Sequence, residues 1–452
     1  MSTADTIVAI ASPAGRGAVG VVRVSGALVP RLATAVLGKL PEPRRAEFRR
    51  FRDAGGRSLD EGLALYFPAP ASFTGEHVLE WQGHGGIVVL DLVVRRLVEL
   101  GCRAALPGEF SERAFLAGKI DVAQAEAVAD LIDAGTAAAA RAAMRSLQGE
   151  FSARVHDLQA QLTELRVHVE AAIDFPDEEI DWLEDQGLDA RLRRVCAAFD
   201  ALGGDARQGA LLREGYTVVI AGKPNSGKSS LLNRLIGDDV AIVTATPGTT
   251  RDVLHHHLQL DGLPLHLLDT AGLRCAADPI EAEGIRRAHM EMARADRVLY
   301  LIEAGSAPAG DLIALDAELA GLPSGVPVTV VYSKIDLAGM PARADYGTTP
   351  AKIFLSAYSG EGIGLLRAHL QASAGYLGGS TGALSARRRH LDALSRARAG
   401  VLRAADTLRA TRALELFAED LRCAQQALGE ITGEFTGDDL LGEIFRSFCI
   451  GK

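Results

Sequence analysis

The segment from Gly222 to Ser229 carries residue types that bind phosphate. It reads Gly-Lys-Pro-Asn-Ser-Gly-Lys-Ser and satisfies the pattern G-x-x-x-x-G-K-S between an apolar run and a helical pattern. Glycines at its ends let the backbone turn so that successive N–H groups point at an anion, while Lys228 reaches the β and γ phosphates and the Ser229 hydroxyl can hold Mg²⁺. The pattern predicts a nucleoside triphosphate site; its alternative is a glycine-rich turn without a ligand.

Two later stretches have the residue types that complete such a site. Asp269-Thr-Ala-Gly272 follows an apolar run, so Asp269 can reach the ligand shell of Mg²⁺ and the Gly272 N–H can approach a γ-phosphate. Gly248-Thr-Thr-Arg-Asp252 lies between the phosphate loop and that run, where a threonine can ligate the metal only while the γ-phosphate is present. Together with the phosphate loop, these stretches predict nucleotide hydrolysis.

The stretch Ser333-Lys-Ile-Asp336 indicates which base is bound. A carboxylate at Asp336 accepts hydrogen bonds from N1–H and the exocyclic amine of guanine, and adenine presents no such pair of donors. GTP is therefore favoured over ATP. Guanine-nucleotide domains usually have Asn or Thr at the position of Ser333, so we expect its hydroxyl to replace part of that bonding, at a cost of about 1 kcal/mol in affinity. Ser356-Ala-Tyr358 is predicted to pack on the base.

A doubly wound α/β domain is the element pattern that would place these motifs together. Helical stretches alternate with short apolar strands, and the motifs follow the strands, where such mostly parallel sheets bind ligands. The predicted strands are Tyr216–Ala221, Leu263–Leu268, Arg297–Ile302, Val326–Val331 and Lys352–Leu355. We expect this nucleotide domain to span residues 215–379.

The N-terminal residues 1–119 predict a separate α+β domain. Gly15 to Gly20 match the G-x-G-x-x-G fingerprint of dinucleotide sites, but a β-branched run follows where that fingerprint needs a helix, so the glycines are expected to form a turn between two strands. The predicted elements are strands at Ile7–Ala11, Val19–Val24, Gly62–Phe67 and Val78–Trp81, and a helix opened by Gln82–Gly86 that covers Ile87–Leu100.

Alanine-rich helix follows from Asp121, which forms a potential capping box with Gln124. Val155, Leu158, Leu162, Leu165 and Val169 share one helical stripe, and a similar stripe from Leu391 to Leu408 is the predicted partner. Residues 120–214 and 380–452 should therefore pack as one helical domain, with the nucleotide domain inserted between its halves. The basic run Arg387–His390 is either a phosphate contact or a solvated helix face.

Composition limits the class of protein. A chain of 452 residues is expected to form two or three domains, and its 48% hydrophobic and 23% charged residues are ordinary for soluble protein. We found no apolar run long enough for a membrane span, no signal peptide and no regular spacing among the five cysteines, so we expect a cytoplasmic protein without membrane contact. The net charge of −10 argues against indiscriminate nucleic-acid binding.

The C-terminus, Leu441-Gly-Glu-Ile-Phe-Arg-Ser-Phe-Cys-Ile-Gly-Lys452, by itself predicts an amphipathic helix with a free cysteine. With this tail and both flanks of the nucleotide domain in view, the whole chain resembles the MnmE (TrmE) family of bacterial tRNA-modification GTPases. The resemblance implies a folate-binding N-terminal domain, a helical domain and an inserted Ras-like P-loop GTPase domain. It implies a homodimer that works with the flavin-dependent partner MnmG on tRNA.

The reaction implied by the resemblance adds a (carboxymethyl)aminomethyl group to C5 of the wobble uridine, with a one-carbon unit from 5-formyl- or 5,10-methylene-tetrahydrofolate. Matching motifs place the folate contacts at Arg23, Glu80, Lys119 and Lys452. Two lysines and an arginine suit the glutamate tail of folate, and a carboxylate suits its amino-pyrimidine edge. From the residues alone, each of the four is equally well explained as a surface charge.

The resemblance also implies metal and catalytic residues in the nucleotide domain. Ser229 and Thr250 would ligate Mg²⁺, and Asn225, Thr244, Thr246 and Thr249 would bind K⁺. The catalytic residues would be Lys228, Cys449 and Glu281, the last orienting the attacking water through a second water. The remaining alternative for Cys449 is a buried helix cysteine. The complete set of expected nucleotide contacts is Asn225, Ser226, Gly227, Lys228, Ser229, Ser230, Thr244, Ala245, Thr246, Pro247, Gly248, Thr249, Thr250, Asp269, Thr270, Ala271, Gly272, Ser333, Lys334, Ile335, Asp336, Ser356, Ala357 and Tyr358.

A second function fits the nucleotide domain equally well. The chain could be a GTP-dependent switch that binds an RNA or a ribosomal particle and takes no part in modification. The N-terminal domain and the Cys-Ile-Gly-Lys tail distinguish the two hypotheses, because only the modification enzyme needs folate.

Overall fold

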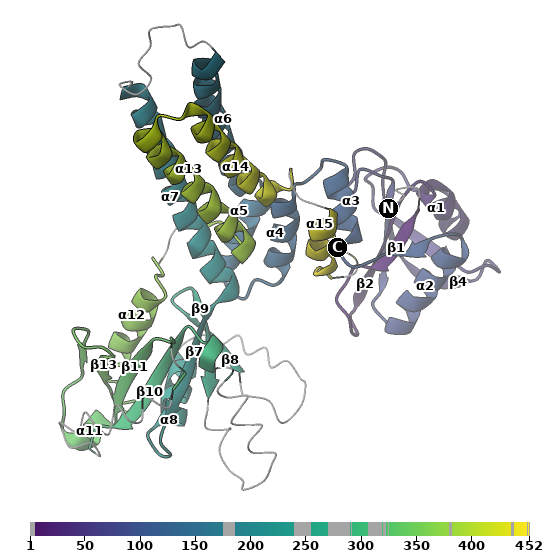
Figure 1. The fold of residues 1–452 in the computed structure, drawn as a ribbon. Coiled ribbons are helices and arrows are strands. Elements are labelled where there is room, and N and C mark those ends of the chain that lie inside the picture. The colour runs from purple at the N-terminus through teal and green to yellow at the C-terminus, as the bar shows by residue number, and fades with distance from the viewer. Residues whose placement is uncertain are drawn as a thin grey trace. The chain divides into compact units, whose positions relative to one another are not determined.

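The structure is a computed structural model of the 452-residue chain (Figure 1). It describes residues 5–174, 186–238, 255–269, 290, 292–305, 319, 322–323, 325–378, 382–434, 438–449 and 451. The chain divides into two compact units, of which unit 1 comprises residues 1–129, 146–199 and 392–452 and unit 2 comprises residues 130–145 and 200–391. Among the described residues, no helix is both long enough and apolar enough to cross a membrane.

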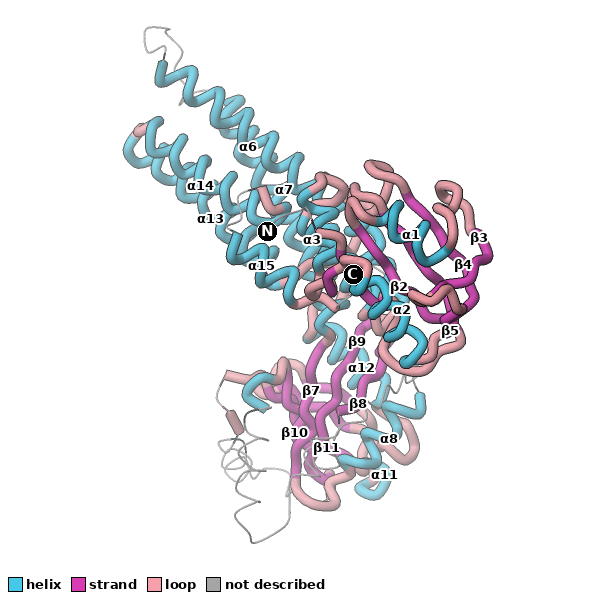
Figure 2. Tube along the Cα trace, turned by 90° about the vertical axis from the view of Figure 1, so that its right-hand side faces the viewer, coloured by secondary structure: helices cyan, strands magenta, loops and turns pink. Residues whose placement is uncertain are grey.

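Unit 1 begins with a six-stranded sheet of order β3-β4-β5-β2-β1-β6, of which Figure 2 labels β2, β3, β4 and β5. Every pairing in it is antiparallel except that of β1 with β6. The elements of this part are β1 (Ile7–Ile10), β2 (Val19–Ser25), α1 (Val29–Leu37), β3 (Glu47–Arg52), β4 (Ser58–Phe67), β5 (Val78–His84), α2 (Ile87–Glu99), β6 (Arg103–Ala104) and α3 (Glu109–Leu116). The stretch from Gly15 to Gly20 leads from β1 into the antiparallel strand β2. The prediction of a turn between two strands, and not a dinucleotide site, is therefore confirmed.

The two faces of this sheet differ because side chains alternate along a strand. One face carries large buried residues, Phe51 and Trp81 among them, that pack with apolar residues of α1 and α2 in a single core. The same alternation places Arg23 and Glu80, both half-buried, on the opposite face of β2 and β5. The sheet therefore presents charged side chains on the face that does not form this core.

Unit 1 also contains long helices. Asp121 and Gln124 form the predicted capping box at the start of α4, since each backbone N–H donates to the other side chain, at 3.0 Å and 2.8 Å. The bounds are α4 (Val122–Ile132), α5 (Ala137–Leu147), α6 (Glu150–Asp174), α7 (Gln186–Glu214), α13 (Arg388–Thr411), α14 (Leu414–Thr432) and α15 (Asp438–Arg446), with parts of α4, α5, α7 and α13 assigned to unit 2.

The predicted partner of the stripe on α6 needs correction. The stripe from Val155 to Val169 is buried, and α14 lies along α6, a neighbour that the prediction of the segment from Leu391 to Leu408 in α13 did not include. Arg166 and Thr163 of α6 both bond Gln425 of α14. Helical spacing in the sequence shows which face of a helix is buried, but it does not show which other helix packs against that face. The prediction missed α14 for this reason.

Unit 2 contains a seven-stranded sheet of order β12-β13-β11-β10-β7-β9-β8. Its five inner strands are parallel and both edge strands are antiparallel, so the predicted mostly parallel α/β domain is confirmed. The elements are β7 (Tyr216–Gly222), α8 (Lys228–Asp238), β8 (His255–Leu260), β9 (Leu263–Asp269), β10 (Arg297–Glu303), β11 (Val328–Ser333), α11 (Ile335–Ala338), β12 (Arg343–Asp345), β13 (Ala351–Phe354) and α12 (Ile363–Ser373).

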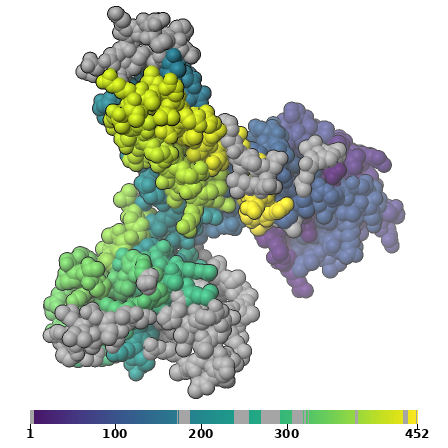
Figure 3. Space-filling view, viewed as in Figure 1, coloured from purple at the N-terminus to yellow at the C-terminus, as the bar shows by residue number. Residues whose placement is uncertain are grey.

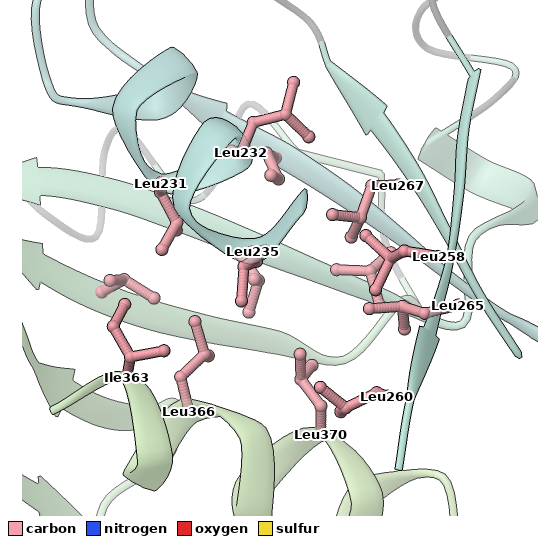
Figure 4. Close-up of a cluster of buried hydrophobic side chains, with 14 of the residues drawn as sticks. Leu231, Leu232, Leu235, Leu258, Leu260, Leu265, Leu267, Ile363, Leu366 and Leu370 are labelled. Carbon is pink, nitrogen blue, oxygen red and sulfur yellow. The ribbon is translucent and has the colours of Figure 1, made fainter. Parts of the chain in front are cut away.

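Helices α8 and α12 cover one face of this sheet. Leucines of α8 and the residues Ile363, Leu366 and Leu370 of α12 meet strand side chains in one buried cluster (Figure 4). A second cluster on the other face includes Val219, Leu268 and Tyr300. Parallel strands that are buried on both faces read as nearly continuous apolar runs, which is why the sequence predicted them.

Some predicted boundaries are wrong. The helix predicted over Ile87–Leu100 is confirmed as α2, with Gly86 as its N-cap, but the strand before it does not end at Trp81: β5 continues to His84, because it pairs with β2 as far as Val19. The C-terminal helix α15 ends at Arg446, so Cys449 lies beyond it. The edge strands β3, β8 and β12 were not predicted: β3 is mostly charged and β12 has only three residues, whereas β8 begins with three histidines although its Leu258 and Leu260 are buried.

Candidate functional sites

The phosphate loop connects β7 to α8. Gly222 ends β7 with φ of 144°, and a Cβ there would lie 2.4 Å from the carbonyl oxygen of Leu301, so only glycine fits. Asn225 and Gly227 are left-handed, with φ of 63° and 90°, and Lys228 begins the helix. These conformations turn the loop so that it leads into a helix N-terminus, which is the arrangement that binds phosphate.

Lys228 is held inside the loop. Its Nζ donates to the carbonyl oxygens of Gly222 at 3.0 Å and Lys223 at 2.8 Å, and only 9% of the residue is exposed. Ser229 and Asn225, which would offer oxygens to cations, are exposed. The ammonium thus closes the base of the loop, while the predicted metal-binding oxygens face solvent.

Ser333, at the end of β11, does not have the role that the sequence predicted. The residue is 3% exposed, and its Oγ donates to the carbonyl oxygen of Ser226, at 2.6 Å, with the carbonyl of Ile302 at 3.2 Å. The expectation that this hydroxyl bonds the base is at odds with this geometry, because its proton is directed to the phosphate loop. The motif's spacing showed the position but not the direction of a short side chain.

Asp336, the predicted base-binding carboxylate, lies in the short helix that follows β11. Lys334 adopts a left-handed conformation with φ of 57°, and the helix α11 that follows presents Asp336 to solvent. The Lys334 Nζ lies 3.0 Å from Glu303 Oε2 at the end of the neighbouring strand β10. The turn after β11 thus exposes a carboxylate at the carboxyl ends of the parallel strands, where the phosphate loop also lies, because β11, β10 and β7 are parallel neighbours.

The stretch from Ser356 to Tyr358 follows β13 at this same edge. Ser356 is fully buried, and its Oγ accepts a hydrogen bond from the Ser359 N–H at 3.1 Å. Tyr358 is 90% exposed. The buried serine shapes the loop, and the tyrosine is left in solvent.

Several predicted residues lie outside the part of the chain that the structure describes. They are Thr244, Ala245, Thr246, Pro247, Gly248, Thr249, Thr250, Thr270, Ala271, Gly272, Glu281 and Lys452. Strand β9 ends at Asp269, which places that residue at the sheet edge next to Ile220 of β7, while its side chain is also outside the description.

Arg23 is the centre of a second group, in unit 1. It lies opposite Glu80 on paired strands, and its Nη2 is 2.9 Å from Glu80 Oε1. Its guanidinium carbon lies 5.8 Å and 5.7 Å from the ring centroids of Phe73 and Phe110. Nη1 donates to the carbonyl oxygen of Gly451 at 3.4 Å. Because Arg23 and Glu80 are in contact, they would touch the same end of an elongated ligand.

Lys119 borders the loop that carries Phe73. The residue is exposed, and its Cε passes 3.6 Å from the position that a Cβ on Gly75 would take. The structure therefore brings Arg23, Glu80 and Lys119 to one region of the N-terminal domain, while Lys452 lies outside the described residues. The sequence did not identify Phe73 or Phe110, because neither lies in a recognised motif.

The C-terminal tail is held against the N-terminal domain by backbone contacts (Figure 3). The Gly108 N–H donates to the carbonyl oxygen of Cys449, at 3.4 Å. A Cβ on Gly451 would lie 2.4 Å from the Ile10 carbonyl oxygen, and its φ is 97°, so the tail needs glycine here. Cys449 itself is exposed, so the alternative of a buried helix cysteine is wrong.

Two arginines and two glutamates of the N-terminal domain form a network of ion pairs at the start of α3. Arg113 bonds Glu109 at 2.9 Å and Glu76 at 3.0 Å, and Arg103 bonds Glu109 at 2.6 Å. Burial alone would raise the pKa of Glu109, but hydrogen bonds from Arg103, the Leu106 N–H and Arg113 outweigh it, so the pKa is lowered. The network connects α3 to the loop before β5, a contact that the sequence could not show.

Asp130 connects the segments that enter and leave the nucleotide domain. Its carboxylate accepts hydrogen bonds from Arg213 at 2.9 Å, Arg387 at 3.0 Å and Ser385 at 2.7 Å, and a cavity of about 170 Å³ adjoins it. His390 is buried. The run from Arg387 to His390 was expected to be either a phosphate contact or a solvated helix face. Both alternatives are wrong for Arg387, which bonds Asp130, and for His390, which is buried.

Comparison with known proteins covers the whole chain. The family model "MnmE helical domain" matches residues 122–449, and "GTP-binding protein TrmE N-terminus" matches residues 6–119. The chain is 58% identical, over 99% of both sequences, to "tRNA modification GTPase MnmE" of Methylococcus capsulatus, and 57% identical, over the full length of both, to the protein of that name from Sodalis glossinidius. The solved G domain of the T. maritima FeoB iron transporter is 25% identical, covering 35% of this chain and 98% of that one, with a TM-score of 0.27, too low to support a structural argument.

Proposed function

The chain belongs to the MnmE family of tRNA modification GTPases, and we propose that it couples GTP hydrolysis to the addition of a (carboxymethyl)aminomethyl group at C5 of a wobble uridine. It is a GTPase with a role in tRNA modification. The observation that carries the proposal is the phosphate loop between β7 and α8 with Asp336 presented at the same sheet edge. The addition of the (carboxymethyl)aminomethyl group itself is proposed from the resemblance of the sequence to this family.

The phosphate loop supplies binding and charge neutralisation. Backbone N–H groups at the start of α8 would bind the β and γ phosphates together with the ammonium of Lys228, which donates to the Gly222 and Lys223 carbonyl oxygens in this structure, while Asp336 would accept from guanine. The exposed hydroxyl of Ser229 is a hard oxygen donor and suits Mg²⁺. With Thr250 it would hold that ion, which neutralises charge that develops on the phosphates.

K⁺ is proposed as the second cation. The left-handed, exposed Asn225 offers a side-chain oxygen beside the phosphates, and Thr244, Thr246 and Thr249 would complete the site. Such an ion would supply the positive charge that an arginine finger supplies in other GTPases. Glu281 would orient the attacking water, since the residue after Gly272 is Leu273, which cannot polarise water.

A tetrahydrofolate derivative, 5-formyl or 5,10-methylene, is proposed to bind near Arg23. The pair of Arg23 and Glu80 offers a donor and an acceptor at one point, flanked by Phe73 on which a flat ring can stack. Lys119 adds a positive charge for the carboxylates of the glutamate tail. Lys452 belongs to this site in the proposal, and the exposed Cys449 is proposed as a catalytic thiol.

The proposed organisation follows the sequence. We divide the chain into an N-terminal domain of residues 1–119, a nucleotide domain of residues 215–379 and a helical domain of residues 120–214 and 380–452. The gap between the end of α3 at Leu116 and the start of α4 at Val122 supports the first boundary. The protein would act in the cytoplasm as a homodimer, together with a flavin-dependent partner, MnmG, on tRNA.

A deletion strain tests the modification directly. Wobble nucleosides of tRNA from cells that lack the chain should lose the C5 group, and wild-type protein should restore it. Protein with Asp336→Asn should fail to restore it, because the amide replaces one acceptor with a donor and shifts the preference to xanthine nucleotides. We expect the purified variant to lose affinity for GTP by about a hundredfold and to gain it for XTP.

Turnover of GTP in matched KCl and NaCl, at several protein concentrations, tests the cation. Rates should be higher in K⁺ and should rise with protein concentration if two nucleotide domains associate. Equal rates in both salts would exclude the K⁺ site. Unchanged wobble nucleosides in the deletion strain, with GTP still hydrolysed, would instead favour the alternative function, a GTP-dependent switch that binds RNA or a ribosomal particle.

A further inference from the structure

Ser333 connects three segments of unit 2 that surround the nucleotide site. It ends β11, and its hydroxyl lies 2.6 Å from the Ser226 carbonyl in the phosphate loop and 3.2 Å from the Ile302 carbonyl in β10. Its own carbonyl accepts from the Ala304 N–H at 2.9 Å. Three residues later, Asp336 is exposed for the base. One buried side chain thus lies between the phosphate-binding and base-binding segments.

The chemistry of a hydroxyl limits what this serine can do. A hydroxyl has one proton, and the shorter contact commits that proton to Ser226. It therefore cannot at the same time donate to an acceptor atom of guanine. The residue is 3% exposed, so the hydroxyl is also shielded from a base bound at the surface.

We propose that Ser333 is a positioning residue that holds the phosphate loop at the end of β11 and does not itself contact guanine. The bond ends on the residue next to Gly227, and the Ser333 Oγ lies only 3.6 Å from the position that a Cβ on Gly227 would take. The loop is therefore fixed just before α8 begins. Loss of the bond should let the loop N–H groups move away from the β-phosphate, while Asp336 keeps the base. This inference rests on the proposed GTP binding.

The experiment compares GMP with GDP. GMP has no β-phosphate, so the ratio of their affinities measures what the phosphate loop contributes. In Ser333→Ala we expect this ratio to fall about fivefold, the effect of one neutral hydrogen bond, with GMP affinity nearly unchanged. Competition against a fluorescent GDP analogue measures both ligands in one titration. Ser333→Thr keeps the hydroxyl and should keep the ratio.

The matched control is Thr329→Val, on the same strand. Thr329 is fully buried, and its hydroxyl bonds Arg297 at 2.8 Å, away from the phosphate loop. This variant should lower thermal stability without changing the ratio. If Ser333→Ala does not fold, Ser333→Cys retains the volume with a much weaker donor and takes its place.

The possible results distinguish a failure of the inference about Ser333 from a failure of the proposed guanine site. Equal losses for GMP and GDP in Ser333→Ala would mean that the hydroxyl contacts the base, and unchanged affinity for both would mean that the bond does not matter; either result overturns the inference. Wild-type protein that binds ADP as tightly as GDP would instead refute the proposed guanine site itself.

Discussion

The phosphate loop and the group around Arg23 are built in opposite ways. The loop is eight consecutive residues whose backbone conformation does the binding, with glycine required at Gly222. The Arg23 group consists of side chains from β2, β5, α3 and the loop before β5, and of the Gly451 carbonyl, which is 428 residues from Arg23 in sequence. A local backbone site can be recognised from a pattern of residues, whereas a site of side chains from distant segments appears only after folding.

The largest effect should follow a change of backbone in the loop. Gly222→Ala would place a Cβ 2.4 Å from the Leu301 carbonyl at a φ of 144°, and neither the strand nor the loop can relieve this contact without moving. We expect nucleotide binding to be lost and the free energy of unfolding to fall by about 2–3 kcal/mol. Calorimetric titration with GDP and chemical denaturation measure the two effects.

Gly364→Ala is the matched control for this change. A Cβ on Gly364, in α12, would meet open space, and its helical conformation suits alanine. It should bind GDP normally and gain about 0.5–1 kcal/mol in stability. Normal GDP binding by Gly222→Ala would show that the loop tolerates a side chain at this position. Nucleotide binding would then not depend on the backbone conformation that glycine allows.

The same contrast explains what the sequence could predict. The strand, loop and helix around Gly222 and the capping box of Asp121 and Gln124 were predicted because each depends on residues close in sequence. The hydrogen bond from Ser333 to the Ser226 carbonyl, across 107 residues, was not, because the motif gives a position and not a side-chain direction. The edge strand β3, with its four charged residues among six, gives no apolar alternation and was missed for that reason.

A smaller effect is expected at Arg23. Arg23→Ala removes the partner of Glu80, which is only 19% exposed, and the donor to the Gly451 carbonyl. The free energy of unfolding should fall by about 1–2 kcal/mol, less than for a fully buried pair, and folate binding should weaken while GTP hydrolysis continues. Denaturation, equilibrium dialysis with 5-formyl-tetrahydrofolate and a phosphate-release assay give these three values.

Arg57→Ala provides the comparison for this prediction. Arg57 also bonds a carboxylate, Asp53 at 2.9 Å, but its side chain is 86% exposed, so its loss should change stability by less than about 0.5 kcal/mol and leave folate binding intact. If both variants lose folate binding equally, the effect comes from general damage to the domain. If GTP hydrolysis falls in parallel with folate binding in Arg23→Ala, the variant is misfolded.

The smallest effect should be a dependence of stability on pH in the N-terminal sheet, which a site made of backbone groups does not share. His84 lies on the same strand face as Glu80, and its Nδ1 bonds the buried Asp60 at 2.7 Å; this hydrogen bond raises the pKa of His84. A raised pKa in the folded protein means that the stabilisation is fully present below the unfolded pKa of about 6.5 and is lost as pH rises through the folded value. The difference in unfolding free energy between wild type and His84→Gln should therefore be larger at about pH 5.5 than at about pH 8.5. It should shrink in high salt, because the His84 side chain is 74% exposed. A difference that is the same at both pH values would show that the histidine contributes only its uncharged hydrogen bond.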